Sequence, residues 1–197
     1  MTSLQEILSC IHSTMQYVTD NQGYSKRPGL YAFSLAHGSS LKAFGKASQI
    51  IYVGKAENSL RQRDLDTHFK DGKTGQSTLR RSIGSILKKE LHATAFSRNG
   101  TLNKPNIDNY IFDTRAEKKL TDWMKKNLLI GYWEYNHAIE TKSLRDIEGE
   151  LIIELKPTLD LDQRTRKYNS YKEELKALRQ ACKDEAKQNV IDKIGYC

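Results

Sequence analysis

Two parts of the sequence carry side chains whose types and spacing could do chemistry. The first is IIYVGKAENSLRQR, residues 50–63, in which Tyr52 stands in a run of β-forming residues and Arg63 in the basic segment after Gly54. A phenol and a guanidinium on either side of a strand-to-helix corner could face one anionic group, because arginine is a permanently charged, forked donor. A strand end followed by a solvated helix is the alternative interpretation.

The second part is a carboxylate that interrupts an apolar stripe. On a helical wheel, Glu148 falls among the apolar residues of the segment 143–156, whereas Glu150 and Glu154 fall on the opposite side. The stripe consists of Leu144, Ile147, Leu151, Ile152 and Leu155. A carboxylate in such a stripe is costly unless a cation pairs with it. Glu148 is therefore either a metal ligand or the partner of a basic residue.

Other residue types with chemical potential lack a matching arrangement. The histidines form no His-x-x-x-His pair and the cysteines no Cys-x-x-Cys pair, so neither indicates a zinc site. The sequence also has no phosphate-binding glycine loop and no Gly-x-Ser-x-Gly nucleophile motif. Three widely spaced cysteines indicate free thiols in a reducing compartment, which predicts a cytoplasmic protein.

The composition predicts a single folded domain with a polyanionic partner. With 38% hydrophobic and 28% charged residues among 197, the chain can bury a core and is not disordered. No apolar run reaches the roughly 20 residues that span a bilayer, and no signal peptide is evident. The net charge of +8 and pI near 9.3 favour nucleic acid or an anionic membrane surface as partner.

Hydrophobic periodicity predicts an α/β fold whose elements would position these side chains. Ser3 and Glu6 have the spacing of a capping box and open an amphipathic helix over residues 3–18 that ends near 21–23. Strands are predicted at 30–35, 49–53, 110–112 and 128–135, and helices at 59–69, 116–126, 143–156 and from 170 onward. Gly54 is expected to end the second strand, and the Asn-rich residues 97–109 are expected to be loop.

A further helix, over residues 77–91, is predicted to have two unlike faces. Its apolar face carries Leu79, Ile83, Ile86 and Leu87, and its basic face carries Arg80, Arg81, Lys88 and Lys89. If the apolar face docks, the basic face stays free and could follow a nucleic-acid backbone. A solvated helix face is the alternative, and the commoner fate of a run of charges.

Several of these segments together resemble the GIY-YIG nuclease superfamily. Gly29-Leu30-Tyr31 and, further on, Tyr52-Val53-Gly54 resemble its two signature strands, and YVGKAEN with Leu60-x-x-Arg63 looks like the second strand and first helix of its repair-incision branch. EGELIIELKPTLD is similar to its metal-binding helix. The chain departs from the family in having Asp160 where asparagine is usual, and in a one-residue longer spacing after Arg63 that makes Arg61 a rival for the arginine role.

The resemblance implies a small antiparallel three-stranded sheet flanked by helices, with a largely helical insertion and extra terminal helices. All of these would belong to one GIY-YIG-like nuclease domain spanning residues 1–197. Its core would comprise residues 27–70 and 128–162, its insertion residues 71–127, and its terminal helices residues 3–18 and 170–188.

The resemblance also implies roles for individual residues. Tyr31 would be the general base, Tyr52 an orienting partner, Arg63 the ligand of the phosphate oxygens, and Glu148 the ligand of Mg²⁺, for which Mn²⁺ could substitute. Tyr31 would need help, because a free phenol titrates near pH 10.

Six further basic positions have expected roles, and two of them, Lys55 and His68, have two possible interpretations. Lys55 and His68 could lower the pKa of Tyr31 or relay its proton, or they could be a phosphate-binding lysine and a structural histidine. Arg61, Arg80, Arg81 and Lys88 are the expected nucleic-acid contacts.

Three classes of function fit these observations. The first is a Mg²⁺-dependent endonuclease that hydrolyses phosphodiester bonds, with DNA expected as substrate from the resemblance. The second is a non-catalytic nucleic-acid-binding module that retains the fold. The third is an interaction protein whose basic charge is incidental, which leaves Glu148 unexplained.

Overall fold

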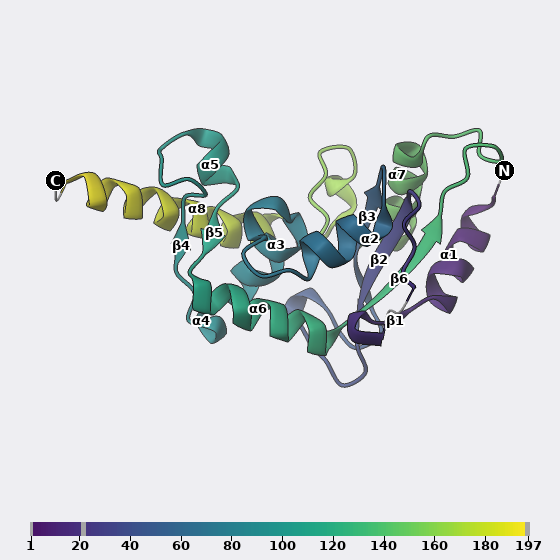
Figure 1. Ribbon diagram of the computed structural model, residues 1–197, viewed down its shortest axis with the longest axis horizontal. Helices are drawn as coiled ribbons and strands as arrows, with labels where there is room; N and C mark the ends of the chain where they lie inside the picture. The colour runs from purple at the N-terminus through teal and green to yellow at the C-terminus, as the bar shows by residue number, and fades with distance from the viewer. Residues whose placement is uncertain (1, 21–22, 196–197) are drawn as a thin grey trace. The chain divides into compact units, whose positions relative to one another are not determined.

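The computed structural model describes residues 2–20 and 23–195 (Figure 1). The chain divides into two compact units. The first comprises the residues up to Asp66 together with Lys125–Lys172, and the second comprises Thr67–Met124 together with the described residues from Glu173 onward. Most of the predicted insertion, 71–127, therefore belongs to the second unit, as does the C-terminal helix.

The first unit is built on an antiparallel sheet. Its strand order is β1–β6–β2–β3, with bounds β1 Gln16–Tyr17, β2 Gly29–Leu35, β3 Ile50–Ala56 and β6 Leu128–Glu134. The predicted α/β class and small antiparallel sheet are confirmed, and the two-residue β1 adds a fourth strand at one edge. β2 lies at the centre, paired with β3 on one side and β6 on the other.

Two helices cover one face of this sheet, α1 (Leu4–Ser13) and α7 (Leu144–Leu155) (Figure 1). Alternate residues of the strands point to this face, and together with the helices they form the core of the unit. The buried members are Ile7, Ile11, Leu30, Ala32, Ile50, Val53, Trp133, Tyr135, Leu144, Ile147, Leu151 and Ile152. The other face is thereby left to Tyr31, Phe33 and Tyr52, whose rings contact one another.

The ends of α1 and β3 differ from the prediction. The capping box of Ser3 and Glu6 is confirmed, but the helix ends at Ser13, so the predicted extent to residue 18 is wrong. The hydroxyl of Thr14 bridges the backbone of Tyr132, donating to its carbonyl at 2.9 Å and accepting from its N–H at 2.8 Å, and the chain then enters β1. Residues 21–22 of the predicted helix end lie outside the described residues. β3 continues through Gly54 to Ala56, so the predicted strand end at Gly54 is also wrong.

The second unit is mainly helical. Its helices are α3 (Thr78–Ile86), α4 (Lys88–Leu91), α5 (Lys104–Asp108) and α6 (Thr114–Asn127), the last running into the first unit, and α8 begins at Lys172 and extends to Gly195. The strands β4 (Ala95–Phe96) and β5 (Ile111–Phe112) pair with each other. Residues 97–109, expected as loop, thus contain the short helix α5, whose first turn includes Pro105. Proline suits this position because the backbone N–H that it lacks would have no acceptor within the helix in the first turn.

The segment between β3 and α3 carries the arginine of the candidate site. The helix α2 (Leu60–Arg63) is capped by the Ser59 hydroxyl, which accepts from the N–H of Gln62. A π-helical turn, Asp64–His68, follows without a break. The helix predicted over residues 59–69 is therefore present, but its second half is wound more widely than an α-helix, which turns the side chains away from the register of an α-helical wheel.

Candidate active site

Tyr31 lies at the centre of the sheet, over a glycine. It stands directly opposite Gly54 in β3 and Tyr132 in β6, and it is only 1% exposed. A Cβ atom at Gly54 would lie 2.4 Å from the Tyr31 hydroxyl oxygen, well inside contact distance. The phenol can occupy this place only because residue 54 has no side chain. Tyr52 lies on the same face, with its ring centroid 6.3 Å from that of Tyr31.

Arg63 points towards Tyr31. Its Nε donates a hydrogen bond to the Tyr31 hydroxyl oxygen at 3.3 Å. Leu60, one helical turn before, is fully buried, whereas Arg61 is exposed. The structure thus places Arg63, and not Arg61, beside the tyrosine pair.

A buried acid next to Arg63 escaped the sequence reasoning. Asp64 is fully buried; its Oδ2 accepts a hydrogen bond from the Tyr24 hydroxyl at 2.6 Å, and its Oδ1 has no partner within the described part of the chain. The Tyr24 ring lies against Tyr132, with centroids 4.7 Å apart. The sequence did contain a signal for a buried acid, because Asp64 follows the apolar Leu60 by four residues and so lies on the same helix face. That is the same argument that singled out Glu148.

The electrostatics of this group favour a protonated Tyr31. Burial raises the pKa of Tyr31 well above its ordinary value, and the neighbouring Tyr52 and Asp64 raise it further. Arg63 opposes this rise by its charge and its hydrogen bond, both of which stabilise the phenolate. Arg63 is therefore the neighbour that makes proton transfer from Tyr31 easier.

A second polar cluster in the first unit contains Glu148, which lies on α7. Its side chain is 12% exposed, and its Oε2 accepts from Arg164 Nη2 at 3.2 Å. Burial raises the pKa of Glu148, while the charges of Lys55 and then Arg164 lower it. Glu150, by contrast, forms an ion pair with Lys142, and its side chain is 43% exposed. The odd carboxylate of the apolar stripe thus has a cationic partner in the structure, the second of the two predicted alternatives.

Asp160 closes the outer edge of β3 close to this group. Its Oδ2 accepts the N–H of Val53 at 2.9 Å, and the neighbouring Leu159 donates its own N–H to the Ile51 carbonyl at 2.9 Å. Burial raises the pKa of Asp160 well above its usual range, and the charge of Glu148 adds to the rise. Asp160 therefore satisfies an edge-strand donor that would otherwise lack a partner.

The donor chemistry around Glu148 fits a hard cation. Within residues 2–20 and 23–195, no cluster of three or more His, Cys, Asp or Glu side chains could by itself enclose a metal ion. Mg²⁺ does not require one, since it is commonly held by one or two carboxylates, with water and substrate phosphate completing its octahedron. Glu148 supplies such a carboxylate, and Asp162 is a second acid whose charge acts on it.

The remaining basic candidates are placed differently from one another. Lys55 is partly exposed on β3 and pairs with Glu57. His68 is fully buried in the second unit, where its Nδ1 lies 2.6 Å from the Ser77 hydroxyl oxygen. Lys88 is half-buried and pairs with Glu185 at 3.1 Å. Burial favours the structural interpretation for His68.

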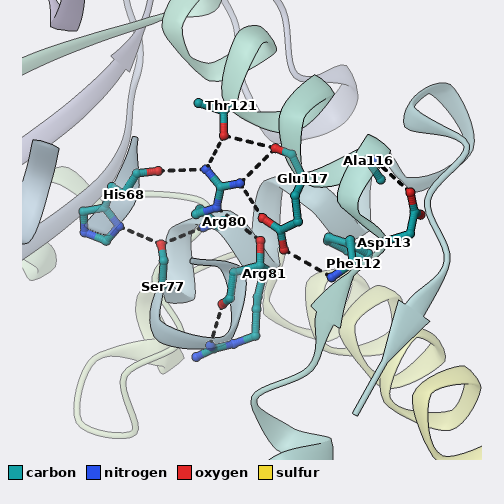
Figure 2. A network of polar contacts seen from close by, with 10 residues as sticks. His68, Ser77, Arg80, Arg81, Phe112, Asp113, Ala116, Glu117 and Thr121 are labelled. Carbon is teal, nitrogen blue, oxygen red and sulfur yellow. Dashed lines mark hydrogen bonds and ion pairs between the residues drawn. The ribbon is translucent and has the colours of Figure 1, made fainter. Parts of the chain in front are cut away.

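The free basic face predicted for α3 is wrong for Arg80 and Arg81. Arg80 is fully buried; its Nη2 donates to Glu117 Oε2 at 2.6 Å, and further donors reach Thr121 and the carbonyls of His68 and Glu117 (Figure 2). Its Nε donates to the Thr74 hydroxyl at 3.1 Å. Arg81 is 7% exposed and donates to the Thr74 carbonyl at 3.0 Å. The helical wheel of this segment did not reveal that its basic side is also packed, because the acidic partner of Arg80, Glu117, lies on a different helix, α6.

A family model of the GIY-YIG catalytic domain matches residues 32–181 of the chain. The match covers most of the chain, including Tyr52, Arg63 and Glu148, and begins one residue after Tyr31. The chain belongs to the GIY-YIG family and carries a nuclease-type domain. Searches of curated proteins and of solved structures gave no match.

The described helices also bear on membrane association. None of those in residues 2–20 and 23–195 is both long enough and apolar enough to cross a bilayer.

Proposed function

We propose that this protein is a Mg²⁺-dependent endonuclease that hydrolyses phosphodiester bonds in DNA. The observation that carries the proposal is the contact between Arg63 Nε and the Tyr31 hydroxyl oxygen, which joins a candidate base to a permanently charged group on a buried aromatic face. A solvated arginine would not be held in this way. Nucleic acid is the substrate class to which the nuclease-type domain points, and the net charge of +8 favours it.

Each residue has a distinct task in this proposal. Tyr31 first gives up its own proton to solvent and then, as the phenolate, takes a proton from the attacking water, while Tyr52 beside it keeps the ring in place. Arg63 stabilises the phenolate, and its permanent charge stabilises the phosphate oxygens, where negative charge builds up in the transition state. Glu148 would hold the divalent cation, Mg²⁺ or in its place Mn²⁺, which when bound acts as a Lewis acid on the phosphate and the departing oxygen.

Lys55 and Arg61 complete the proposed substrate contacts. Lys55 acts electrostatically on Glu148 and is partly exposed, so its ammonium group can neutralise a phosphate beside the cation. Arg61 is exposed on α2 and would contact the backbone of the nucleic acid outside the scissile position. The two free thiols among the described residues, Cys10 and Cys182, suit a reducing compartment, and we place the protein in the cytoplasm.

One observation favours the second candidate, a nucleic-acid-binding module without catalysis. The pair between Glu148 and Arg164 gives the buried carboxylate a partner within the chain, so a metal ion is not the only explanation for its presence in the apolar stripe. Both candidates predict DNA binding that weakens with salt, and only the enzyme predicts cleavage.

Plasmid cleavage with and without Mg²⁺ separates the two. The wild-type protein should convert supercoiled DNA to nicked or linear product only when Mg²⁺ is present. Glu148→Gln, which keeps the shape of the side chain and removes its charge, should lose cleavage by about 10²-fold or more. Glu150→Gln is the matched control on the same helix and should cleave like the wild type. Metal-independent cleavage, or full activity of Glu148→Gln, would overturn the proposal.

A further inference from the structure

Arg164 is held entirely by groups around the candidate metal ligand. Its Nη2 donates to Glu148 at 3.2 Å, and its Nε and backbone N–H donate to Asp162 Oδ1 at 3.0 and 2.8 Å. Its Nη1 donates to the backbone carbonyl of Arg145 at 3.3 Å. The guanidinium thus joins the loop after Pro157 to α7, at the carboxylate that the proposed function assigns to Mg²⁺.

The same guanidinium can reach solvent. The Arg164 side chain is 33% exposed and that of Asp162 is 39% exposed, whereas that of Glu148 is 12% exposed. Arg164 therefore lies at the mouth of the group, with Glu148 behind it. An arginine here can turn outward without leaving a buried charge of its own, and it keeps Asp162 as a partner if Glu148 is withdrawn.

A divalent cation and this guanidinium compete for one carboxylate. Glu148 already feels the positive charges of Lys55 and Arg164, and a cation bound to it would repel both. Arginine forks also bind phosphate oxygens in the same two-pronged geometry as carboxylates. Arg164 can therefore bind either kind of anion, a carboxylate of its own chain or a phosphate.

We propose that Arg164 is a phosphate-positioning residue that exchanges partners. It holds Glu148 until a divalent cation takes that carboxylate, and then contacts a phosphate of the substrate. This inference rests on the proposed function. In this exchange, a cation that binds Glu148 frees Arg164 for a phosphate, and a phosphate that binds Arg164 frees Glu148 for a cation. Binding of the metal and binding of the nucleic acid therefore strengthen each other.

Binding of Mn²⁺, followed by the electron paramagnetic resonance signal of the free ion, tests the exchange without cleavage. All proteins carry Tyr31→Phe so that a DNA duplex remains intact. Without DNA, Arg164→Gln should bind Mn²⁺ roughly fivefold more tightly or better than the parent, because the competing cation is gone. Adding the duplex should tighten Mn²⁺ binding strongly in the parent and much less in Arg164→Gln.

Arg166→Gln is the matched control, since it removes the same charge from an exposed position two residues on, and it should bind Mn²⁺ like the parent. Equal or weaker Mn²⁺ binding by Arg164→Gln than by the parent would overturn the exchange. Glu148→Gln separates this outcome from a failure of the proposed function. If Glu148→Gln binds Mn²⁺ as well as the parent does, the metal site itself is wrongly assigned.

Discussion

At the scale of single residues, the chemistry depends on which arginine faces Tyr31. Arg63 donates to the tyrosine hydroxyl, and Arg61 is exposed two residues before it. Arg63→Ala should lower the cleavage rate by about 10²-fold or more, as the loss of a preorganised charge stabiliser usually does. Arg61→Ala should affect substrate affinity at low salt more than the rate at saturating DNA. Single-turnover cleavage by the two variants measures both effects, and an active Arg63→Ala would contradict the assignment.

Asp64 predicts a pH dependence of stability. Burial raises its pKa well above the usual range, and the Tyr24 hydrogen bond and the charge of Arg63 oppose this only in part. The folded protein therefore keeps this proton to a higher pH than the unfolded chain does. The resulting stability is complete below the ordinary carboxyl pKa, near 3.9, and is lost as pH rises through the folded pKa.

Asp64→Asn removes this titration and nearly preserves the shape of the side chain. Its free energy of unfolding should fall less steeply than that of the wild type between about pH 4 and pH 8. Urea unfolding at several pH values measures the difference, and Asp66→Asn, at an exposed position in the same turn, should follow the wild type. Parallel pH curves for Asp64→Asn and the wild type would show that folding does not raise the pKa of Asp64.

At the scale of elements, periodicity predicted the helices and strands of the sheet unit but misjudged features set by distant contacts. Glycine in a strand was interpreted as a breaker, yet β3 continues through Gly54, where the missing side chain leaves space for the Tyr31 ring. Arg80 was expected on a free helix face, as a nucleic-acid contact or else a solvated charge, since arginine is almost never fully buried unless paired. Its partner Glu117 lies 37 residues away, a distance that no helical wheel covers. The resemblance to a family could name Tyr31, Arg63 and Glu148, but neither Arg164 nor Tyr24.

The interpretation of Gly54 can be tested by adding one methyl group. Gly54→Ala would place Cβ 2.4 Å from the Tyr31 hydroxyl oxygen, so the phenol must move away from its present position. We expect a loss of about 1–3 kcal/mol of stability, as for other overpacked cores, together with a loss of cleavage. Gly149→Ala is the matched control: the nearest atom to its Cβ is 3.8 Å away, and alanine should stabilise α7 by up to about 1 kcal/mol. Thermal unfolding of both variants measures the contrast.

At the scale of the whole molecule, the chain joins two units that hold their interiors together differently. The sheet unit buries an apolar cluster between β-strands, α1 and α7. The helical unit buries an ion pair, with Arg80 fully buried and the Glu117 side chain 5% exposed. Glu117 also accepts the N–H of Phe112 at 3.2 Å, so the pair ties α3 and α6 to β5 (Figure 2). Removing either Arg80 or Glu117 would leave the other as an unpaired buried charge inside the helical unit.

Arg80→Ala should therefore destabilise the helical unit selectively. Removing one member of a buried pair typically costs about 3–5 kcal/mol, a large part of the stability of an ordinary domain. Hydrogen exchange should speed up in α3, α6 and β5, while β2 and β3 keep their protection. The double variant Arg80→Met with Glu117→Gln should recover part of the loss, because it removes both charges and retains an acceptor for Phe112. If β2 and β3 lose protection as much as α3 does, the two units unfold as one cooperative structure, and the buried arginine supports the sheet that carries Tyr31 as well.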